Sequence, residues 1–429
     1  MGPIKRLRIS DPHFEKSFQS LLQRKVEMSA DVEVLVKSIL RNVQERGDAA
    51  LFEYAEKYDH TTVDAVSVRI SPEVIDKAYT TIDAQQISDF RMAAERIEAF
   101  HKKRLRHLNI NEPAGGMIDE VTRPLERVGI YVPGGKALYP SSVLMTAIPA
   151  RVAGVDEIVM VSPRVSSTVL AAAKIAGVSR VYRIGGAHAI AALAYGTETI
   201  PQVDKIVGPG NVYVETAKRL VFGTVGIDML AGPSEVLIVA DETAVPSFAA
   251  ADLIAQAEHD EDALCLIIAT SEAFLTAVEK ELFLQLDATT RQAIARKSIE
   301  RNCVMILAHP LDKALELANR IAPEHLELMT ENPEMLLKKI THAGAVFLGQ
   351  YSPVAVGDYL AGPSHVLPTG GTARFFSPLG VEDFVKRISV ISFTRDGLSD
   401  LGKTVTRLAH LEGLDAHAKA IEMRILPDD

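Results

Sequence analysis

Hydrophobic and polar positions change their spacing along the chain and divide it into segments. Apolar residues recur every three or four positions in residues 13–58, and again from Pro72 to about Arg106, which predicts long amphipathic helices. A short β-branched run at 66–70 predicts a strand between them. From about Val128 onward, short apolar runs alternate with helical segments, so a different kind of fold begins there.

The apolar runs in the middle of the chain form two series of predicted strands. These runs are mainly apolar and do not alternate with polar residues, which is typical of strands buried on both faces of a parallel sheet covered by helices. We therefore expect an α/β fold with two Rossmann-like domains and mostly parallel sheets. The first series is 157–162, 180–184 and 205–207, and the second is 235–240, 263–269, 303–308, the stretch after His325, and 345–348.

The last part of the chain, from about residue 382, follows a helical period. Gly413 can end its first helix, and a second short helix would follow. A helical pair this short cannot bury an apolar stripe by itself, so it must dock on its own chain or on a neighbouring one. The stripe consists of Leu398, Leu401, Val405, Leu408 and Leu411.

Composition narrows the class of protein. The 429 residues are enough for two or three domains at about 150 residues each. Lys and Arg number 46 against 56 Asp and Glu, and this net charge of −10 disfavours a nucleic-acid partner. No apolar run approaches the ~18 residues of a membrane span. The N-terminal sequence lacks the apolar stretch of a secretory signal, and Cys265 and Cys303 lie in apolar runs as small core residues, so we expect a cytoplasmic protein.

Glycine-rich turns follow several predicted strands. They occupy 131–137, 184–189 and 208–211, at the carboxyl edge where α/β sheets bind ligands. The GPGN turn at 208–211 suits a phosphate, but Tyr213 stands where the dinucleotide fingerprint has its third glycine. Nucleotide binding and plain strand-to-helix connections both remain open.

Imidazole, carboxylate and amide groups mark further candidate chemistry. Gln256 and His259 lie three residues apart at the end of a predicted helix, so their side chains share one face. Glu324 and His325 are adjacent where a strand begins, which makes a usable acid/base unit. A surface amide with a capping histidine, and an ordinary loop, are the respective alternatives.

A long glycine- and proline-rich loop, 357–380, holds Asp358 and His365. Ordered loops of this length in a compact domain are usually functional. Carboxylate, imidazole and amide oxygen together are ligands that zinc accepts. No spacing rule predicts a site whose ligands come from separated places.

Several motifs together resemble the histidinol dehydrogenases, zinc- and NAD-dependent enzymes of the last steps of histidine biosynthesis. The resemblance spans roughly residues 25–425, and FSPLGVEDFVKR with the pair Glu412 and His417 favours the histidinol branch over sister dehydrogenases of other alcohols. The motifs are VGIYVPGG, GPGNVYVETAKR, DMLAGPSEVLIVAD, DLIAQAEHD, IAPEHLEL, VGDYLAGPSHVLPTGGTARFFSPLGVEDFVKR and HLEGLDAHAKAI.

The resemblance implies a role for each matching residue. His325 is the expected general base and Glu324 the expected activator of water. One zinc per subunit is expected on Gln256, His259, Asp358 and His417. Substrate contacts are expected from Ser234, Gln256, His259, His325, Asp358, His365, Glu412 and His417. NAD contacts are expected from Tyr131, Asn211 and His188, the last standing where the family usually has Gln.

The expected activity is the four-electron oxidation of L-histidinol to L-histidine in a homodimer whose subunits share each active site. A sister zinc dehydrogenase acting on another amino alcohol or a polyol sulfonate is the alternative enzyme, and a non-catalytic metal- or nucleotide-binding protein is the alternative class. The expected segments are an N-terminal helical part (1–24), a discontinuous catalytic α/β domain (25–130 and 234–381), an NAD domain (131–233) and a tail that docks on the partner (382–429).

Overall fold

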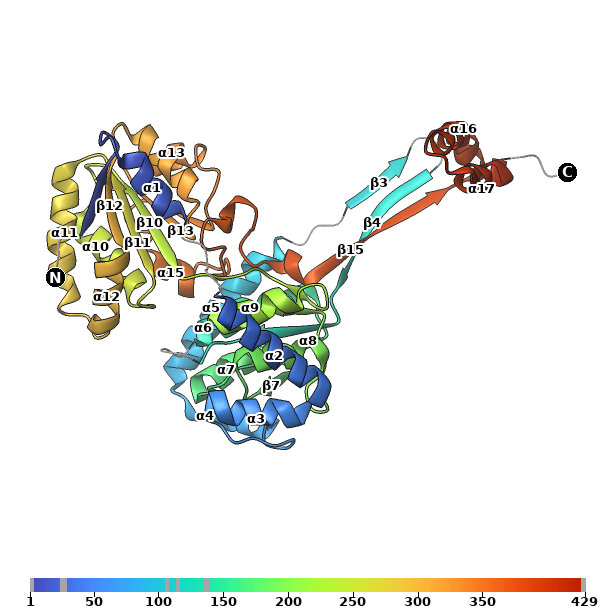
Figure 1. Cartoon of the computed structure of the whole chain (residues 1–429), viewed down its shortest axis with the longest axis horizontal. Helices are drawn as coiled ribbons and strands as arrows, with labels where there is room; N and C mark the ends of the chain where they lie inside the picture. Colours follow the sequence, from blue (N-terminus) through green and yellow to red (C-terminus); the bar gives the residue numbers. More distant parts are fainter. Residues whose placement is uncertain (1–3, 24–28, 105–107, 113–115, 135–138, 426–429) are drawn as a thin grey trace.

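Two six-stranded sheets, each covered by helices, form separate lobes, and a three-stranded ribbon forms an arm that leads away from them (Figure 1). The computed structural model describes residues 4–23, 29–104, 108–112, 116–134 and 139–425. Part of the 131–137 turn and the ends of three predicted segments (1–24, 72–106 and 382–429) lie outside these residues. The α/β class with mostly parallel sheets is confirmed.

The sheet of the first lobe, called sheet A, is parallel throughout. Successive residues of its apolar strands point to opposite faces, so both faces need cover. α10 (Pro246–Ala257), α11 (Glu272–Leu286) and α12 (Gln292–Asn302) cover one face, and α1 (Phe14–Leu22) and α13 (Leu311–Ile321) cover the other. Its strands, in spatial order, are β1 (Lys5–Arg8), β12 (Cys303–Leu307), β11 (Leu264–Ala269), β10 (Glu235–Ala240), β13 (His325–Met329) and β14 (Ala345–Leu348).

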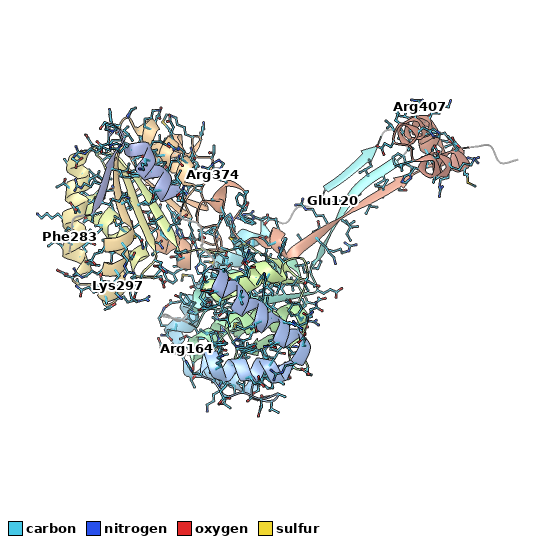
Figure 2. All side chains as sticks on the ribbon, in the orientation of Figure 1. Glu120, Arg164, Phe283, Lys297, Arg374 and Arg407 are labelled. Carbon is cyan, nitrogen blue, oxygen red and sulfur yellow. The ribbon has the colours of Figure 1, made fainter. Side chains whose placement is uncertain are left out.

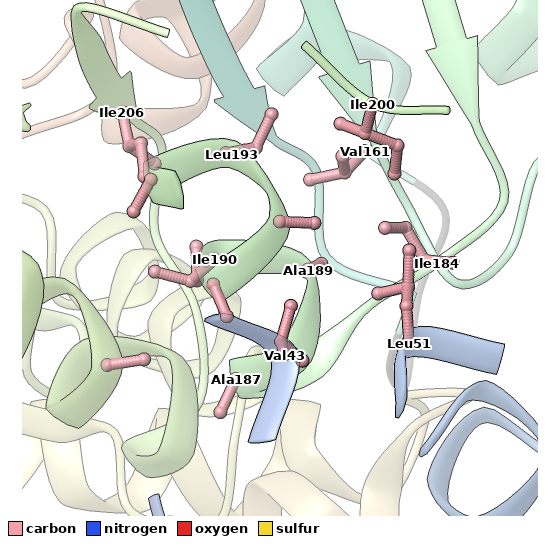
Figure 3. Packing of buried hydrophobic residues seen from close by; sticks show 14 of the residues in the cluster. Val43, Leu51, Val161, Ile184, Ala187, Ala189, Ile190, Leu193, Ile200 and Ile206 are labelled. Atoms are coloured by element: carbon pink, nitrogen blue, oxygen red, sulfur yellow. The ribbon is translucent and has the colours of Figure 1, made fainter. Parts of the chain in front are cut away.

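The sheet of the second lobe, called sheet B, is parallel except for its edge strand β2. Figure 3 shows Val43, Ile190 and Leu193 among the buried side chains on one face. The strands, in order, are β2 (Arg69–Ile70), β7 (Arg180–Tyr182), β6 (Glu157–Val161), β5 (Arg127–Tyr131), β8 (Lys205–Val207) and β9 (Gly226–Ile227). The covering helices are α2 (Ala30–Arg46), α3 (Asp48–Asp59), α8 (Gly186–Tyr195) and α9 (Val212–Val221) on one face, and α4 (Pro72–Thr81), α5 (Ala84–Lys102), α6 (Pro140–Ala153) and α7 (Ser167–Ala176) on the other.

The arm is an antiparallel ribbon of β3 (Leu108–Glu112), β4 (Gly116–Pro124) and β15 (Val385–Phe393). It carries α16 (Arg395–Leu411) and α17 (Asp415–Ile425) at its far end, away from both lobes, where Figure 2 labels Arg407. The two tail helices and the glycine turn between them agree with the prediction, since Gly413 adopts φ 71°. The ribbon that carries them was not predicted.

Strand pairing divides the chain differently from the predicted domain boundaries. β1 lies within the expected helical segment 1–24 but pairs with β12, so this segment belongs to the first lobe. β2 pairs with β7, and the helices between residues 30 and 102 pack on sheet B rather than joining 234–381. The apolar faces of sheet B require this cover, whereas sequence order does not reveal which sheet a helix covers.

Several local predictions also change. The helices expected over 13–58 and 72–106 are interrupted, by Gly47 at φ 53° and by the extended Ile82. Cys265 and Cys303 lie opposite each other in adjacent strands, buried and free, as predicted for core residues. No helix of the described part of the chain has the length and hydrophobicity to cross a membrane.

Candidate active site

A cavity of about 690 Å³ lies between the two lobes. The second lobe contributes α5, the start of α6 and the turn at Pro209, and the first lobe contributes the end of α10, the start of β13 and the loop that follows α15 (Val354–Tyr359). A pocket of this size can enclose a small substrate.

The cavity lies where opposite edges of the two sheets meet. The turn after β8 is at the carboxyl edge of sheet B, next to the point where strand order reverses between β5 and β8. In sheet A the residues in the wall, Ser234, Glu324 and His325, stand at the amino ends of β10 and β13. The segment 228–234 passes from one sheet to the other. The glycine-rich turns of sheet B therefore face the polar residues that begin the strands of sheet A.

His325 is held in one tautomer by the neighbouring strand. Its Nδ1 lies 3.0 Å from the backbone oxygen of Glu235. Because a carbonyl can only accept, Nδ1 carries the proton and the Nε2 lone pair can take up another one. Burial lowers the pKa of His325, although Asp358 opposes this shift, so the ring is neutral near pH 7.

The side chains of Glu324 and Glu235 each accept a hydrogen bond from the backbone N–H of the other residue. The Glu235 N–H donates to Glu324 Oε2 at 2.8 Å, and the Glu324 N–H donates to Glu235 Oε1 at 3.2 Å. Burial raises the pKa of Glu324 well above its ordinary value, and the carboxylates of Glu235 and Asp358 add to this rise. This wall of the pocket therefore carries more acidic than basic groups, an environment that favours a bound cation.

Three of the four predicted metal ligands line this cavity. Gln256 lies in the last turn of α10, His259 follows just after this helix, and Asp358 lies in α15. The buried Nε2 of Gln256 has no hydrogen-bond partner among the described residues. The N-terminus of α15 is fixed because the Val354 N–H donates to Glu327 Oε1 at 3.0 Å. Amide, imidazole and carboxylate together form a donor set that suits a divalent ion.

His365 joins the two lobes across the pocket. Its Nδ1 lies 3.1 Å from the Asp358 backbone oxygen and 4.0 Å from Oδ1 of the same residue. Its Nε2 lies 3.2 Å from the Ser142 hydroxyl of α6. Because Nδ1 donates to the carbonyl, Nε2 accepts from the Ser142 hydroxyl, and the ring is neutral. Burial lowers the pKa of His365, which favours this neutral form.

The predicted cofactor residues gather at the carboxyl edge of sheet B but do not line the cavity. Tyr131 is buried and its hydroxyl accepts from the Gly186 N–H at 3.1 Å. His188 is 1% exposed, and its Nε2 lies 3.0 Å from Asp59 Oδ2. Asn211 is exposed and caps α9. Two of the three therefore shape the turns at this edge, and only Asn211 faces solvent.

Glu412 and His417 are not in the pocket of their own chain. Both are exposed and belong to the tail at the far end of the arm (Figure 1). Within the described residues no group of three His, Cys, Asp or Glu side chains is arranged to hold a metal. Of the predicted set, only His259 and Asp358 are of these types and come from the same pocket, and Gln256 is an amide.

Sequence reasoning missed several residues that the fold places here. Glu235 opens an apolar strand, and a lone carboxylate at that position was the available signal. Ser142 left no signal in the pattern of its helix. Glu215 and Lys218 are buried and lie three residues apart in α9, a spacing that a search for paired charges would have found.

The chain is similar to histidinol dehydrogenases over nearly its whole length. A family profile described as histidinol dehydrogenase matches residues 22–425. The histidinol dehydrogenase of Geobacter metallireducens is 50% identical over 429 residues, with 98% of each chain covered. The histidinol dehydrogenase of Neisseria meningitidis serogroup B is 48% identical, and the match covers 98% of this chain and 100% of that protein. The crystal structure of histidinol dehydrogenase from Elizabethkingia anophelis matches with a TM-score of 0.93 at 36% identity, with 98% of each chain covered.

Gly344 offers a steric test of the pocket wall. A Cβ there would lie 2.6 Å from the Glu324 backbone oxygen, so Gly344→Ala must displace the start of β13. We expect a loss of about 1–3 kcal/mol in the free energy of unfolding, measured in urea, and a larger proportional loss of turnover. Gly226→Ala, which adds a methyl group 3.3 Å from Asp204 O in sheet B, is the control. Full turnover in Gly344→Ala would contradict this account of the wall.

Proposed function

Because the chain belongs to the histidinol dehydrogenase family, we propose that its interlobe pocket oxidises L-histidinol through L-histidinal to L-histidine. It is an NAD-dependent oxidoreductase of histidine biosynthesis. Converting a primary alcohol to a carboxylate removes four electrons, and each NAD accepts one hydride, so two NAD are consumed. The observation that carries the proposal is the buried pair Glu324 and His325, with an acceptor nitrogen on His325, beside Gln256, His259 and Asp358 in one cavity.

One zinc ion per subunit is part of this proposal. Gln256, His259 and Asp358 fit it by donor chemistry, as amide oxygen, imidazole and carboxylate, and by the carboxylates of Glu235 and Glu324 beside them. His417 of the partner subunit would complete the set. When bound, the ion would hold and orient the substrate through the imidazole and the amine of the substrate.

His325 would take the hydroxyl proton while hydride leaves the carbinol carbon for NAD. Its Nδ1–H bond to Glu235 fixes the ring, and the lowered pKa keeps Nε2 ready to accept a proton at neutral pH. In the second oxidation Glu324 would activate the water that adds to the aldehyde. Closure of the pocket would keep the reactive amino aldehyde from escaping.

NAD would bind at the carboxyl edge of sheet B. Asn211 is the exposed polar residue there, and Tyr131 and His188 would act by shaping the turns beside it. The interlobe position brings this edge next to Ser234 and His325 of sheet A. We place the reaction in the cytoplasm, where NAD-dependent biosynthesis takes place.

A homodimer with exchanged tails is the third part of the proposal. The tail exposes Leu401, Val405, Leu408 and Leu411, and such a stripe is normally covered by another surface. It also carries His417 and Glu412, which are not among the residues that line the interlobe cavity of their own chain. A two-fold dimer would bring each tail to the other subunit's cavity.

Substrate choice separates the family activity from the sister alternative. We expect NADH formation with L-histidinol and little with other amino alcohols or polyol sulfonates, because the substrate's imidazole is a metal ligand. The measurement is NADH absorbance across this substrate panel. Turnover of a polyol sulfonate but not of histidinol would favour the sister enzyme, and metal uptake without any turnover would favour a binding protein.

The two oxidations should respond differently to changes at the start of β13. Glu324→Gln removes the carboxylate that activates water, so it should slow the oxidation of added histidinal strongly and hydride transfer from histidinol less. His325→Asn should impair both steps. Glu331→Gln, at an exposed site beyond the same strand, is the matched control. Equal losses in both steps for Glu324→Gln would refute the division of labour.

Mixing two inactive variants tests the exchange of tails. In a heterodimer of Asp358→Ala and His417→Ala subunits with crossed tails, one site lacks both ligands and the other has a full set. Random pairing after joint unfolding and refolding should restore roughly a quarter of wild-type activity. Each variant refolded alone is the control. A mixture that stays inactive would mean that the tail folds back on its own chain.

A further inference from the structure

We infer that Glu215 is a positioning residue that ties the cofactor side of the pocket to its substrate side. The inference rests on the proposed function, since it concerns the placement of NAD relative to histidinol. Glu215 lies in α9, within the GPGNVYVETAKR motif, and none of the expected catalytic, metal, substrate or cofactor residues includes it.

The carboxylate of Glu215 joins two segments that are distant in sequence. Its Oε1 accepts from the Gly210 N–H at 2.9 Å, in the turn that leads to Asn211. Its Oε2 accepts from the Ala231 N–H at 2.9 Å, in the loop that leads to Ser234. The side chain is 1% exposed, so both bonds are shielded from water.

Two neighbouring charges hold the same turn from its other end. Lys218 Nζ lies 2.7 Å from Asp228 Oδ1 and donates to the Gly208 backbone oxygen at 3.0 Å. The Gly208 N–H donates to Asp228 Oδ2 at 2.7 Å. Gly208 has φ 109°, and a Cβ there would lie 2.3 Å from the Tyr131 backbone oxygen. The turn is therefore fixed at both ends against β5.

Both tied segments border the cavity. Pro209 belongs to the turn, and Ala231 and Ser234 belong to the loop. The loop continues into Glu235, whose N–H binds Glu324. A shift of one segment against the other would change the distance between the hydride acceptor and the carbinol carbon, and small misplacements of this kind slow transfer steeply.

The charges themselves point to positioning rather than to folding alone. Lys218 and Asp228 already form a buried ion pair with no net charge, and both also bond to the backbone of Gly208. Glu215 adds a further buried carboxyl group, 3.5 Å from Lys218 Nζ. Burial raises its pKa to about 7, so its negative charge is costly to keep. What the carboxylate supplies in return is two acceptor oxygens for two backbone N–H groups, which no other side chain of its shape can provide.

Glu215→Gln is the direct test. Its amide keeps one acceptor but turns a donor toward the second N–H, so one of the two segments is released while Lys218 and Asp228 stay paired. We expect kcat/KM for histidinol to fall about tenfold to a hundredfold. The kinetic isotope effect with carbinol-deuterated histidinol should rise, because hydride transfer becomes slower than the other steps. The thermal unfolding midpoint should stay near that of the wild type.

Glu33→Gln is the matched control, because Glu33 pairs with Arg219 on the exposed side of the same helix. It should leave kcat/KM and the isotope effect unchanged. A second variant, Glu215→Asp, keeps the charge beside Lys218 but is one carbon too short to reach both N–H groups, so it should reproduce the kinetic change.

Three results would overturn the inference. Wild-type kinetics in both Glu215 variants would show that the two bonds do not matter for turnover. A fall in kcat without any change in the isotope effect would indicate a smaller active fraction. Failure of both variants to fold, judged by circular dichroism, would make Glu215 a requirement of folding. Inactivity of the wild type toward histidinol would instead refute the proposed function.

Discussion

The reciprocal hydrogen bonds between Glu324 and Glu235 fix the geometry on which the rest of the pocket depends. They lock together the amino ends of two neighbouring strands, β10 and β13. Glu235 also orients His325, because the Nδ1 of this histidine donates to the Glu235 backbone oxygen. In addition, Glu235 Oε1 accepts from the Gly370 N–H at 3.1 Å. One cluster of hydrogen bonds thus orders Glu324, His325 and the middle of the long loop that carries Asp358 and His365.

This arrangement places the carboxyl groups of Glu235 and Glu324 together at the amino edge of sheet A. The carboxyl ends of parallel strands are the common ligand edge, and sheet B uses them in its glycine turns. Sheet A contributes the amino ends of its strands instead, so the glycine-rich turns of sheet B face the carboxyl and imidazole groups of sheet A. Burial is the main cause of the raised pKa of Glu324, and the neighbouring carboxylates of Glu235 and Asp358 add to it. The zinc ion of the proposed function would offset the repulsion among these carboxylates.

The sequence predicted elements better than their assembly. Apolar runs located most strands of both sheets, because burial on both faces leaves a strong pattern. β1, β9 and the strands of the ribbon were missed, since short edge strands and an exposed ribbon carry no such pattern. The division of helices between the lobes was also hidden, because an apolar stripe does not state which sheet it covers. For the site, spacing alone gave only adjacent pairs such as Glu324 and His325. The convergence of Gln256, His259 and Asp358, and the absence of His417 from its own pocket, depend on tertiary structure and on the family motifs.

The central claim is that one enclosed pocket carries an alcohol through both oxidations. The most direct measurement is the amount of NADH formed from a limiting, known quantity of L-histidinol in excess NAD, with free histidinal assayed in the same mixture. The account predicts two NADH for each histidinol, with histidine as the product and no aldehyde in solution. One NADH per histidinol with histidinal released, or no NADH at all, would contradict it.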